Sequence, residues 1–185
     1  LKKEEIIRAY LIIKLIKIYN YPIESIELEK EYSIGRPKES RARLDILVND
    51  ERKESNKAFM LIEVKAPEKY EKDGKYTKEE AIEGQLFKIA SQEKNPKYLI
   101  YYTCEEINSN FNEKKIIIDY VKFSSYDDWK EGGYVSLDEV PEEYGIAKKS
   151  IYVNKQLSEL KEGEKKLNNH YGKTEFLSLK KDLHD

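Results

Sequence analysis

The stretch Leu61-Ile62-Glu63-Val64-Lys65-Ala66-Pro67 decides which fold and which chemistry we expect of this chain. Its apolar residues predict a buried strand over residues 58–64. Because side chains alternate along a strand, Glu63 and Lys65 share one face, whereas Val64 points with Ile62 into an apolar layer. An acidic and a basic side chain therefore stand next to each other where this strand ends.

A second apolar strand, Arg43-Leu44-Asp45-Ile46-Leu47-Val48, comes before it in the chain. Alternation puts Leu44 and Ile46 on one face and Asp45 on the other. A lone carboxylate in an apolar strand is costly unless something compensates its charge. If the two strands pair as a hairpin, Asp45 and Glu63 meet at the same height, and a divalent cation between them would compensate both. A structural ion pair with Lys65 at a sheet edge is the alternative interpretation.

The expected cation is Mg²⁺, for which Mn²⁺ can substitute. Mg²⁺ prefers oxygen ligands, and Asp45, Glu63 and the main-chain carbonyl of Val64 provide them. Glu5 (or Glu4), in the first turn of an expected N-terminal helix, is either a supporting ligand or an ordinary helix acid. The cation would polarise a phosphoryl oxygen and acidify a bound water, and Lys65 would stabilise the charge that develops on phosphorus. These residues predict an in-line attack of water on a phosphodiester.

The pattern along the rest of the chain predicts an α/β fold, in which a central mixed sheet is flanked by helices in the order α-β-β-β-α-β. Helices are expected over residues 2–20 and 78–92, strands over 26–34, 43–48, 58–64, 98–103 and 115–119, and a charged loop over 67–78. Thr77 and Glu80 form a capping box that begins the second helix. In the strand over residues 26–34, Leu28 and Tyr32 are expected on the same face.

The charge balance limits the partners of the chain. Its 185 residues include 34 Lys and Arg and 36 Asp and Glu, a net charge of −2, which excludes a generally basic nucleic-acid binder. Positive charge is instead concentrated locally, in Arg36, Lys38, Arg41 and Arg43. This basic cluster is interpreted either as a contact with DNA phosphates or as an ordinary solvated turn.

Two further features concern location. The single cysteine, Cys104, excludes an internal disulfide, fits a reducing cytoplasm and is expected to be a small buried residue. The most apolar stretch, residues 9–21, contains Lys14 and Lys17 and is too short to span a membrane. We therefore expect a cytoplasmic protein without a membrane partner.

The residues described so far resemble the PD-(D/E)XK nucleases, in which an Asp, a spacer and Glu-x-Lys form the catalytic centre. More narrowly, residues 4–103 look like the N-terminal nuclease domain of type I restriction-enzyme R subunits and of related fused restriction–methylation enzymes. The motifs that carry the resemblance are Glu4–Arg8, Glu29 and Glu31 before Gly35, Arg43–Val48, Leu61–Pro67, and Gln85-Leu86.

The resemblance also implies a role for Gln85. In that family a helix glutamine often begins a Gln-x-x-x-Tyr signature, which helps to contact DNA and to order the site. Here Gln85 is present, but Ile89 stands where the signature has tyrosine. Gln85 is therefore interpreted either as a fourth catalytic residue beside Asp45, Glu63 and Lys65 or as an ordinary helix residue.

By this resemblance we expect a Mg²⁺-dependent endonuclease that cuts double-stranded DNA as the cleavage module of a restriction–modification enzyme. Residues 1–120 would form the nuclease core, and residues 121–185 an extension that packs on it or links it to a following motor or methylase. Other domains or subunits of that complex are the expected partners. Two alternatives stay open, namely a repair or recombination nuclease and an inactive nuclease-like fold that serves DNA binding or assembly. The intact set of Asp45, Glu63 and Lys65 argues against the inactive fold, whereas Ile89 keeps it open.

Overall fold

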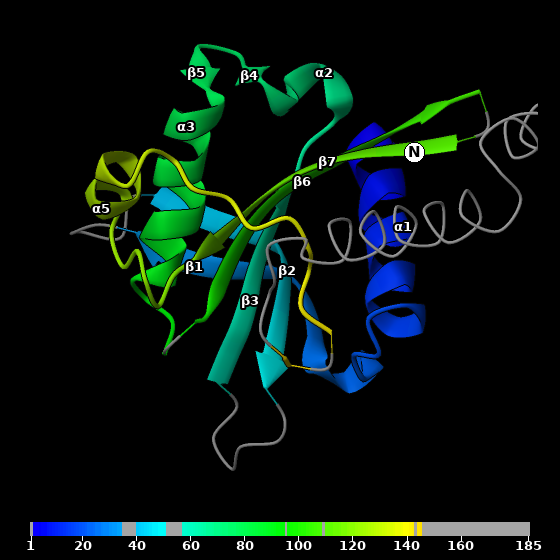
Figure 1. Ribbon diagram of the computed structural model, residues 1–185, viewed down its shortest axis with the longest axis horizontal. Coiled ribbons are helices and arrows are strands. Elements are labelled where there is room, and N and C mark those ends of the chain that lie inside the picture. Colours follow the sequence, from blue (N-terminus) through cyan, green and yellow to red (C-terminus); the bar gives the residue numbers. More distant parts are fainter. Residues whose placement is uncertain are drawn as a thin grey trace, which may run out of the picture. The chain divides into compact units, whose positions relative to one another are not determined.

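A mixed β-sheet carries the residues of interest in the computed structural model (Figure 1), which describes residues 2–34, 40–50, 57–94, 96–108, 110–142, 144 and 145. Within these residues the main sheet has the strand order β1-β2-β3-β6-β7. Its strands are β1 (Ile26–Ile34), β2 (Ser40–Asp50), β3 (Lys57–Val64), β6 (Tyr98–Ile107) and β7 (Asn110–Asp119). β3 and β6 pair in parallel and the other neighbours are antiparallel. The predicted α/β fold with a central mixed sheet is confirmed.

The parallel pair β3–β6 requires a long crossover connection. It begins with α2 (Pro67–Tyr70) and a small hairpin of β4 (Lys72–Asp73) and β5 (Tyr76–Thr77). It continues as one helical segment made of α3 (Lys78–Ala81), η2 (Ile82–Phe87) and α4 (Lys88–Ala90). The loop predicted over residues 67–78 is therefore wrong, because this stretch forms a short helix and a hairpin.

Local chemistry explains both parts of this connection. Pro67 occupies the start of α2, where its missing N–H is not needed. Gly74, with a φ of +62°, lies at the tip of the β4–β5 hairpin, where a left-handed backbone suits a two-residue turn. The predicted capping box is confirmed, since the Glu80 N–H donates to Thr77 Oγ1 at 3.3 Å and the Thr77 N–H to Glu80 Oε2 at 2.8 Å.

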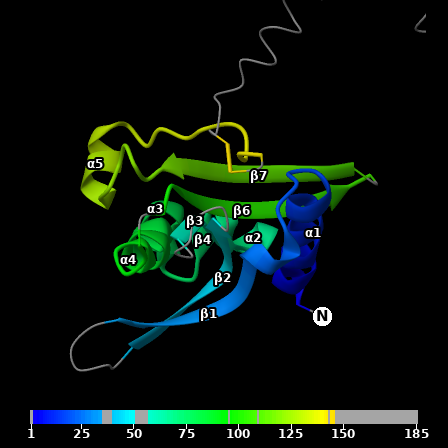
Figure 2. The same cartoon turned by 90° about the horizontal axis from the view of Figure 1, so that it is seen from below.

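Helices cover both faces of the sheet (Figure 2). On one face, α1 (Lys3–Lys17) buries Ile7, Leu11 and Leu15 against Ile46, Ile62 and Val64. On the other face, the helical segment buries Ile82, Leu86 and Ile89 against Leu47, Leu61 and Leu99. β3 is therefore buried on both sides, and only its end is left to carry polar side chains.

The alternation of β1 and β2 changes near Glu29, which has a φ of +54°. Leu44 packs in the core beneath the helical segment, whereas Ile46 packs beneath α1. Likewise Tyr32 is buried but Leu28 is 49% exposed. The predicted common faces of Leu44 with Ile46 and of Leu28 with Tyr32 are therefore wrong. In β1 the reason is Glu29, because strict alternation holds only where the backbone is extended throughout.

Beyond the sheet, α5 (Tyr126–Glu131) buries Trp129 in the core beneath the helical segment. A short 3₁₀ turn, η1 (Ile23–Ser25), leads from α1 into β1. Among the described helices, none combines the length and the apolar content that crossing a bilayer demands. Residues 146–185, which include most of the predicted C-terminal extension, lie outside the described part of the chain.

Candidate active site

The side chain of Asp45, on β2, forms a hydrogen bond with the end of β3. Its Oδ2 accepts a hydrogen bond from the Val64 N–H at 2.8 Å, and the Nη1 of Arg8, on α1, lies 3.5 Å from its Oδ1. The same Arg8 nitrogen donates to Glu29 Oε1 at 2.7 Å. Both oxygens of Asp45 are thus oriented by the protein, and the carboxylate stands beside Glu63, as the hairpin pairing predicted.

Glu63 and Lys65 meet where β3 ends, as their shared strand face predicted. Lys65 Nζ lies 3.0 Å from Glu63 Oε1 and 3.6 Å from Asp73 Oδ2. Glu63 is 4% exposed and Lys65 is 6% exposed. Among the described residues, Glu63 Oε2 is a buried atom for which no hydrogen-bond partner is found. A buried acceptor without a partner is costly, so this oxygen is suited to receive a ligand.

The electrostatics of the three side chains favour a cation. Burial, and then the charge of Asp45, raise the pKa of Glu63 to about 7, although Lys65 opposes this. Burial also raises the pKa of Asp45, against the Val64 hydrogen bond and the charge of Arg8. Burial alone would lower the pKa of Lys65, but Glu63 and Asp73 outweigh it and the pKa is raised. Two carboxylates are therefore held where ionisation is costly, which is a property of many functional sites.

A cleft of about 510 Å³ opens over these residues. Its walls come from β2, the end of β3, the helical segment, and the beginnings of α1 and α2. Besides Lys65, four cationic side chains line it, namely Arg41, Arg43, Lys69 and Lys88. The cleft thus combines an acidic centre with a basic rim, although the chain as a whole is net negative.

Of the two acidic residues in the first turn of α1, Glu4 lines the cleft and Glu5 does not. The Glu5 carboxylate accepts a hydrogen bond from the main-chain N–H of Lys2 at 3.3 Å, at the start of the helix. Glu4 lines the cleft, and its negative charge adds to the influences that raise the pKa of Asp45 and Glu63. Neighbouring helix residues point about 100° apart, so only one of the two can face the cleft.

Gln85 lines the same cleft from the helical segment. It lies in η2, which is a π-helical turn, and such turns occur frequently at functional sites. Its Oε1 is a second buried atom for which the described residues provide no hydrogen-bond partner. Ile89, at the position of the signature tyrosine, is fully buried in the core and takes no part in the cleft.

The predicted basic cluster is described only in part. Arg41 and Arg43 line the cleft with exposed side chains, and Arg41 Nη1 lies 3.4 Å from Glu31 Oε2. Arg36 and Lys38 lie outside the described residues. The arginines of β2 therefore stand where a phosphate backbone entering the cleft would meet them.

Several residues that shape this site are not distinguished by any pattern in the sequence. In the sequence, Arg8 stands out only as the last residue of the Glu4–Arg8 motif, and Asp73 lies in the stretch interpreted as a loop. Lys69 and Lys88 could not be distinguished from the many other lysines of the chain. Their common signal appears only in three dimensions, where all four line the cleft or contact a residue that does.

The donors present fit a hard divalent cation. Within the described part of the chain, no group of three or more His, Cys, Asp or Glu forms a metal-binding cluster. Asp45 and Glu63 offer two carboxylates, and Mg²⁺ typically uses one or two carboxylates and keeps several waters. A structural zinc site would require a fuller set of Cys or His ligands. The partnerless Glu63 Oε2 is the atom that a cation would satisfy.

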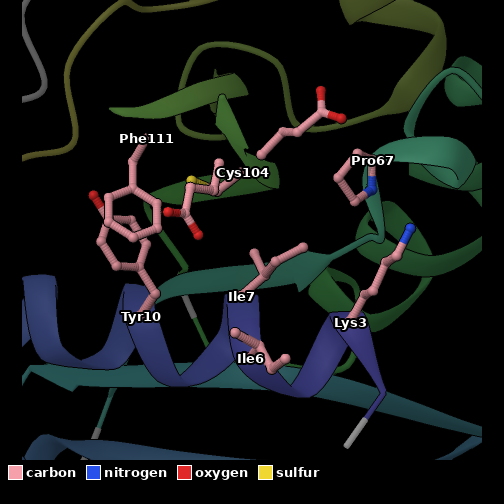
Figure 3. A pocket seen from close by; sticks show the side chains of 9 residues that line it. Lys3, Ile6, Ile7, Tyr10, Pro67, Cys104 and Phe111 are labelled. Atoms are coloured by element: carbon pink, nitrogen blue, oxygen red, sulfur yellow. The ribbon is translucent and has the colours of Figure 1, made fainter. Parts of the chain in front are cut away.

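A separate hollow of about 390 Å³ lies between the beginning of α1, Pro67 and the β6–β7 hairpin (Figure 3). Tyr10 and Phe111 stack at one end of it, with ring centroids 4.5 Å apart. Cys104 lines it and is buried, as expected of a small core residue. Asp45, Glu63 and Lys65 do not line this hollow, so it is no extension of the acidic cleft.

Comparison with known proteins assigns the family. A family model described as "Type I restriction enzyme R protein N terminus" matches residues 3–101, which is more than half of the chain. The matched range contains Asp45, Glu63, Lys65 and Gln85, together with Arg8 and both described arginines of the rim. Among curated proteins, no match to the chain was found. The chain belongs to the family of type I restriction enzyme R protein N-termini, and this membership implies a nuclease module of a restriction system.

Proposed function

We propose that this chain is a Mg²⁺-dependent endonuclease module that hydrolyses phosphodiester bonds of double-stranded DNA within a restriction–modification enzyme. The observation that carries the proposal is the convergence of Asp45, Glu63 and Lys65 in one cleft, with Glu63 Oε2 buried and partnerless. The match to the R protein N-terminal family supports the restriction context. Other domains or subunits of the enzyme are the proposed partners, and the cytoplasm is the proposed location.

Asp45 and Glu63 would hold the cation, with the main-chain carbonyl of Val64 as a third protein ligand. When bound, Mg²⁺ supplies Lewis-acid polarisation of the phosphate and a more acidic water. Arg8 and the Val64 N–H already orient the Asp45 carboxylate, so little reorganisation accompanies binding. Mn²⁺ has similar ligand preferences and is expected to substitute.

Lys65 would stabilise the negative charge that builds on the phosphate oxygens. Glu63 and Asp73 keep its amine protonated in spite of burial, so a full positive charge is held at the floor of the cleft. Charge stabilisation by a preorganised group in a site of low polarity is usually the largest contribution to catalysis. Gln85 can donate from its amide to a phosphate oxygen or accept from the attacking water, because its Oε1 has no partner among the described residues.

The basic rim would position the DNA. Arg41 and Arg43 of β2, Lys69 of α2 and Lys88 of α4 present positive charge around the acidic centre. Such contacts with phosphates fix the register of the duplex without reading its sequence. The choice of target sequence is therefore assigned to other parts of the enzyme.

The test is cleavage of supercoiled plasmid by the full chain, alone and assembled in its restriction complex, with Mg²⁺ or Mn²⁺. We expect the wild-type protein to nick or linearise the plasmid and Glu63→Gln to leave it intact. Glu106→Gln, an exposed acid of β6 outside the cleft, is the matched control and should cut like the wild type. Cleavage by Glu63→Gln at the wild-type rate would contradict the proposal.

A further inference from the structure

Tyr76 is an exposed aromatic residue beside the acidic cleft. It belongs to the β4–β5 hairpin, which lies between α2 and α3 near the end of β3 in Figure 1. Its side chain is 52% exposed, and it forms one wall of a hollow of about 290 Å³. The proposed cleavage mechanism assigns no function to this ring.

The hollow beside Tyr76 is continuous with the catalytic cleft. The two share Lys65, Asp73, Gly84, Gln85 and Lys88. Gly84 lines both hollows, and a Cβ built there would meet nothing within 4 Å, so no side chain fills the space at this point. A nucleotide whose phosphate lies at Lys65 could therefore extend its base toward the tyrosine ring.

The hairpin that carries Tyr76 is anchored to the catalytic centre. Asp73, its cross-strand partner, lies 3.6 Å from Lys65 Nζ through Oδ2. Thr77, the next residue, caps α3 through the hydrogen bonds with Glu80 described above. The cross-strand partner of Tyr76 and the residue after it in the chain are thus both fixed, the first by a catalytic side chain and the second by a helix start.

The chemistry of the hollow suits a nucleobase. An exposed tyrosine ring offers a face on which any base can stack. Gln85 Oε1, buried and without a partner among the described residues, can accept a hydrogen bond from a base amine or ring N–H. Lys75 Nζ lies 5.1 Å from the centroid of the Tyr76 ring, and Lys88 lines the hollow, so positive charge for the sugar–phosphate chain is close by.

We propose that Tyr76, Gln85 and the hollow between them form a binding subsite for an unpaired nucleobase next to the scissile phosphate. This inference rests on the proposed function and narrows its substrate. A stacked base in a duplex must leave its neighbours to reach the ring, and this costs least where the base is already unpaired. DNA with a flipped, bulged or frayed nucleotide at the cleavage position is therefore the favoured substrate.

The test compares the affinities of two duplexes that are identical except for one bulged 2-aminopurine, with Ca²⁺ in place of Mg²⁺ to prevent cutting. We expect Tyr76→Ala to weaken binding of the bulged duplex by about tenfold and to leave binding of the intact duplex nearly unchanged. Tyr76→Phe should bind like the wild type. Phe111→Ala, at a similarly exposed aromatic residue outside both hollows, is the matched control and should have no effect.

The fluorescence of the bulged 2-aminopurine supplies a second measurement, because stacking on the tyrosine ring should quench it in the wild type and not in Tyr76→Ala.

Equal binding of the bulged duplex by wild type and Tyr76→Ala would overturn the subsite, as would equal weakening for both duplexes. If Glu63-dependent cleavage persists in that case, the proposed nuclease function stands and only the subsite fails. If the subsite binds but no cleavage depends on Glu63, the nuclease function fails alone. If the wild type binds neither duplex, both proposals fail.

Discussion

Lys65 Nζ lies 3.0 Å from Glu63 Oε1 although both side chains are almost completely buried at the end of β3. The pair is asymmetric, because Lys65 also faces Asp73, whereas the second oxygen of Glu63 has no partner among the described residues. A cation bound at that oxygen would compensate the negative charge of the buried Glu63 carboxylate. It would thereby weaken the attraction between Glu63 and the Lys65 amine. The arrangement thus couples metal binding to the charge offered to a substrate phosphate.

Metal affinity should depend on pH through Glu63. Its pKa is raised by burial and by Asp45 to about 7, so the carboxylate must lose a proton to bind a cation at lower pH. We expect the affinity for Mn²⁺ to fall roughly tenfold for each pH unit below the pKa. Titration calorimetry in buffers of different ionisation enthalpy measures both the affinity and the proton released. An affinity that does not vary between about pH 5 and about pH 8 would contradict metal binding by a Glu63 carboxylate of raised pKa.

In the absence of divalent ions, the free energy of unfolding should fall as the pH rises, whereas the metal affinity rises with pH. Because the folded pKa of Glu63 is raised above its ordinary value of 4.5, its stabilising contribution is fully present below that value and is lost as the pH rises through about 7. We expect Glu63→Gln to remove part of this loss, so that the variant gains stability relative to wild type as the pH rises. Urea unfolding in EDTA at a series of pH values measures the difference. Parallel pH profiles for the two proteins would contradict the raised pKa.

Lys65→Met should abolish most cleavage without weakening metal binding. The substitution keeps the apolar stem that packs at the end of β3 and removes only the charge. Loss of one preorganised charge-stabilising group lowers the rate by about a hundredfold or more. The rate of plasmid cleavage is compared at matched DNA occupancy, with Lys114→Met as the control on the exposed face of β7. A large fall in melting temperature with an unchanged cleavage rate would identify a structural ion pair instead.

Neutralising Arg41 and Arg43 should weaken DNA binding without altering sequence preference. Both side chains are exposed and line the cleft, where they can displace counterions from phosphates. For Arg41→Gln combined with Arg43→Gln, we expect the slope of log affinity against log salt to become shallower by about 1.8. Lys114→Gln with Lys122→Gln removes the same charge from exposed positions outside the cleft. If the control pair changes the slope equally, the arginines make no specific contact.

The cap at Thr77 should contribute to the stability of the segment that carries Gln85. Thr77 Oγ1 accepts the hydrogen bond of the Glu80 N–H, and Thr77→Ala removes this acceptor. A lost N-cap typically costs about 1 kcal/mol of the free energy of unfolding. Trp129, the single tryptophan, is buried against the same core and reports urea unfolding by fluorescence. Thr77→Ser keeps the hydroxyl and should retain the stability, and an equal loss in both variants would argue against the cap.

Local patterns in the sequence determined much of the fold. The shared face of Glu63 and Lys65, the burial of Val64 with Ile62 and the capping box at Thr77 all depend on residues within a few positions of one another. Side-chain alternation and helix capping arise from the backbone itself, so a sequence shows them directly. The placement of Asp45 beside Glu63 followed from one further assumption, the antiparallel pairing of β2 and β3.

Tertiary structure alone decided the rest of the site. Whether Glu4 or Glu5 faces the cleft depends on how α1 is rotated against the sheet, and the face of Leu28 depends on the positive φ of Glu29. The contact of Asp73 with Lys65 required a hairpin where the sequence indicated a loop. Contacts between separate elements are set by packing and register across the whole core, and because a rotation of about 100° separates neighbouring helix residues, no local pattern specifies them.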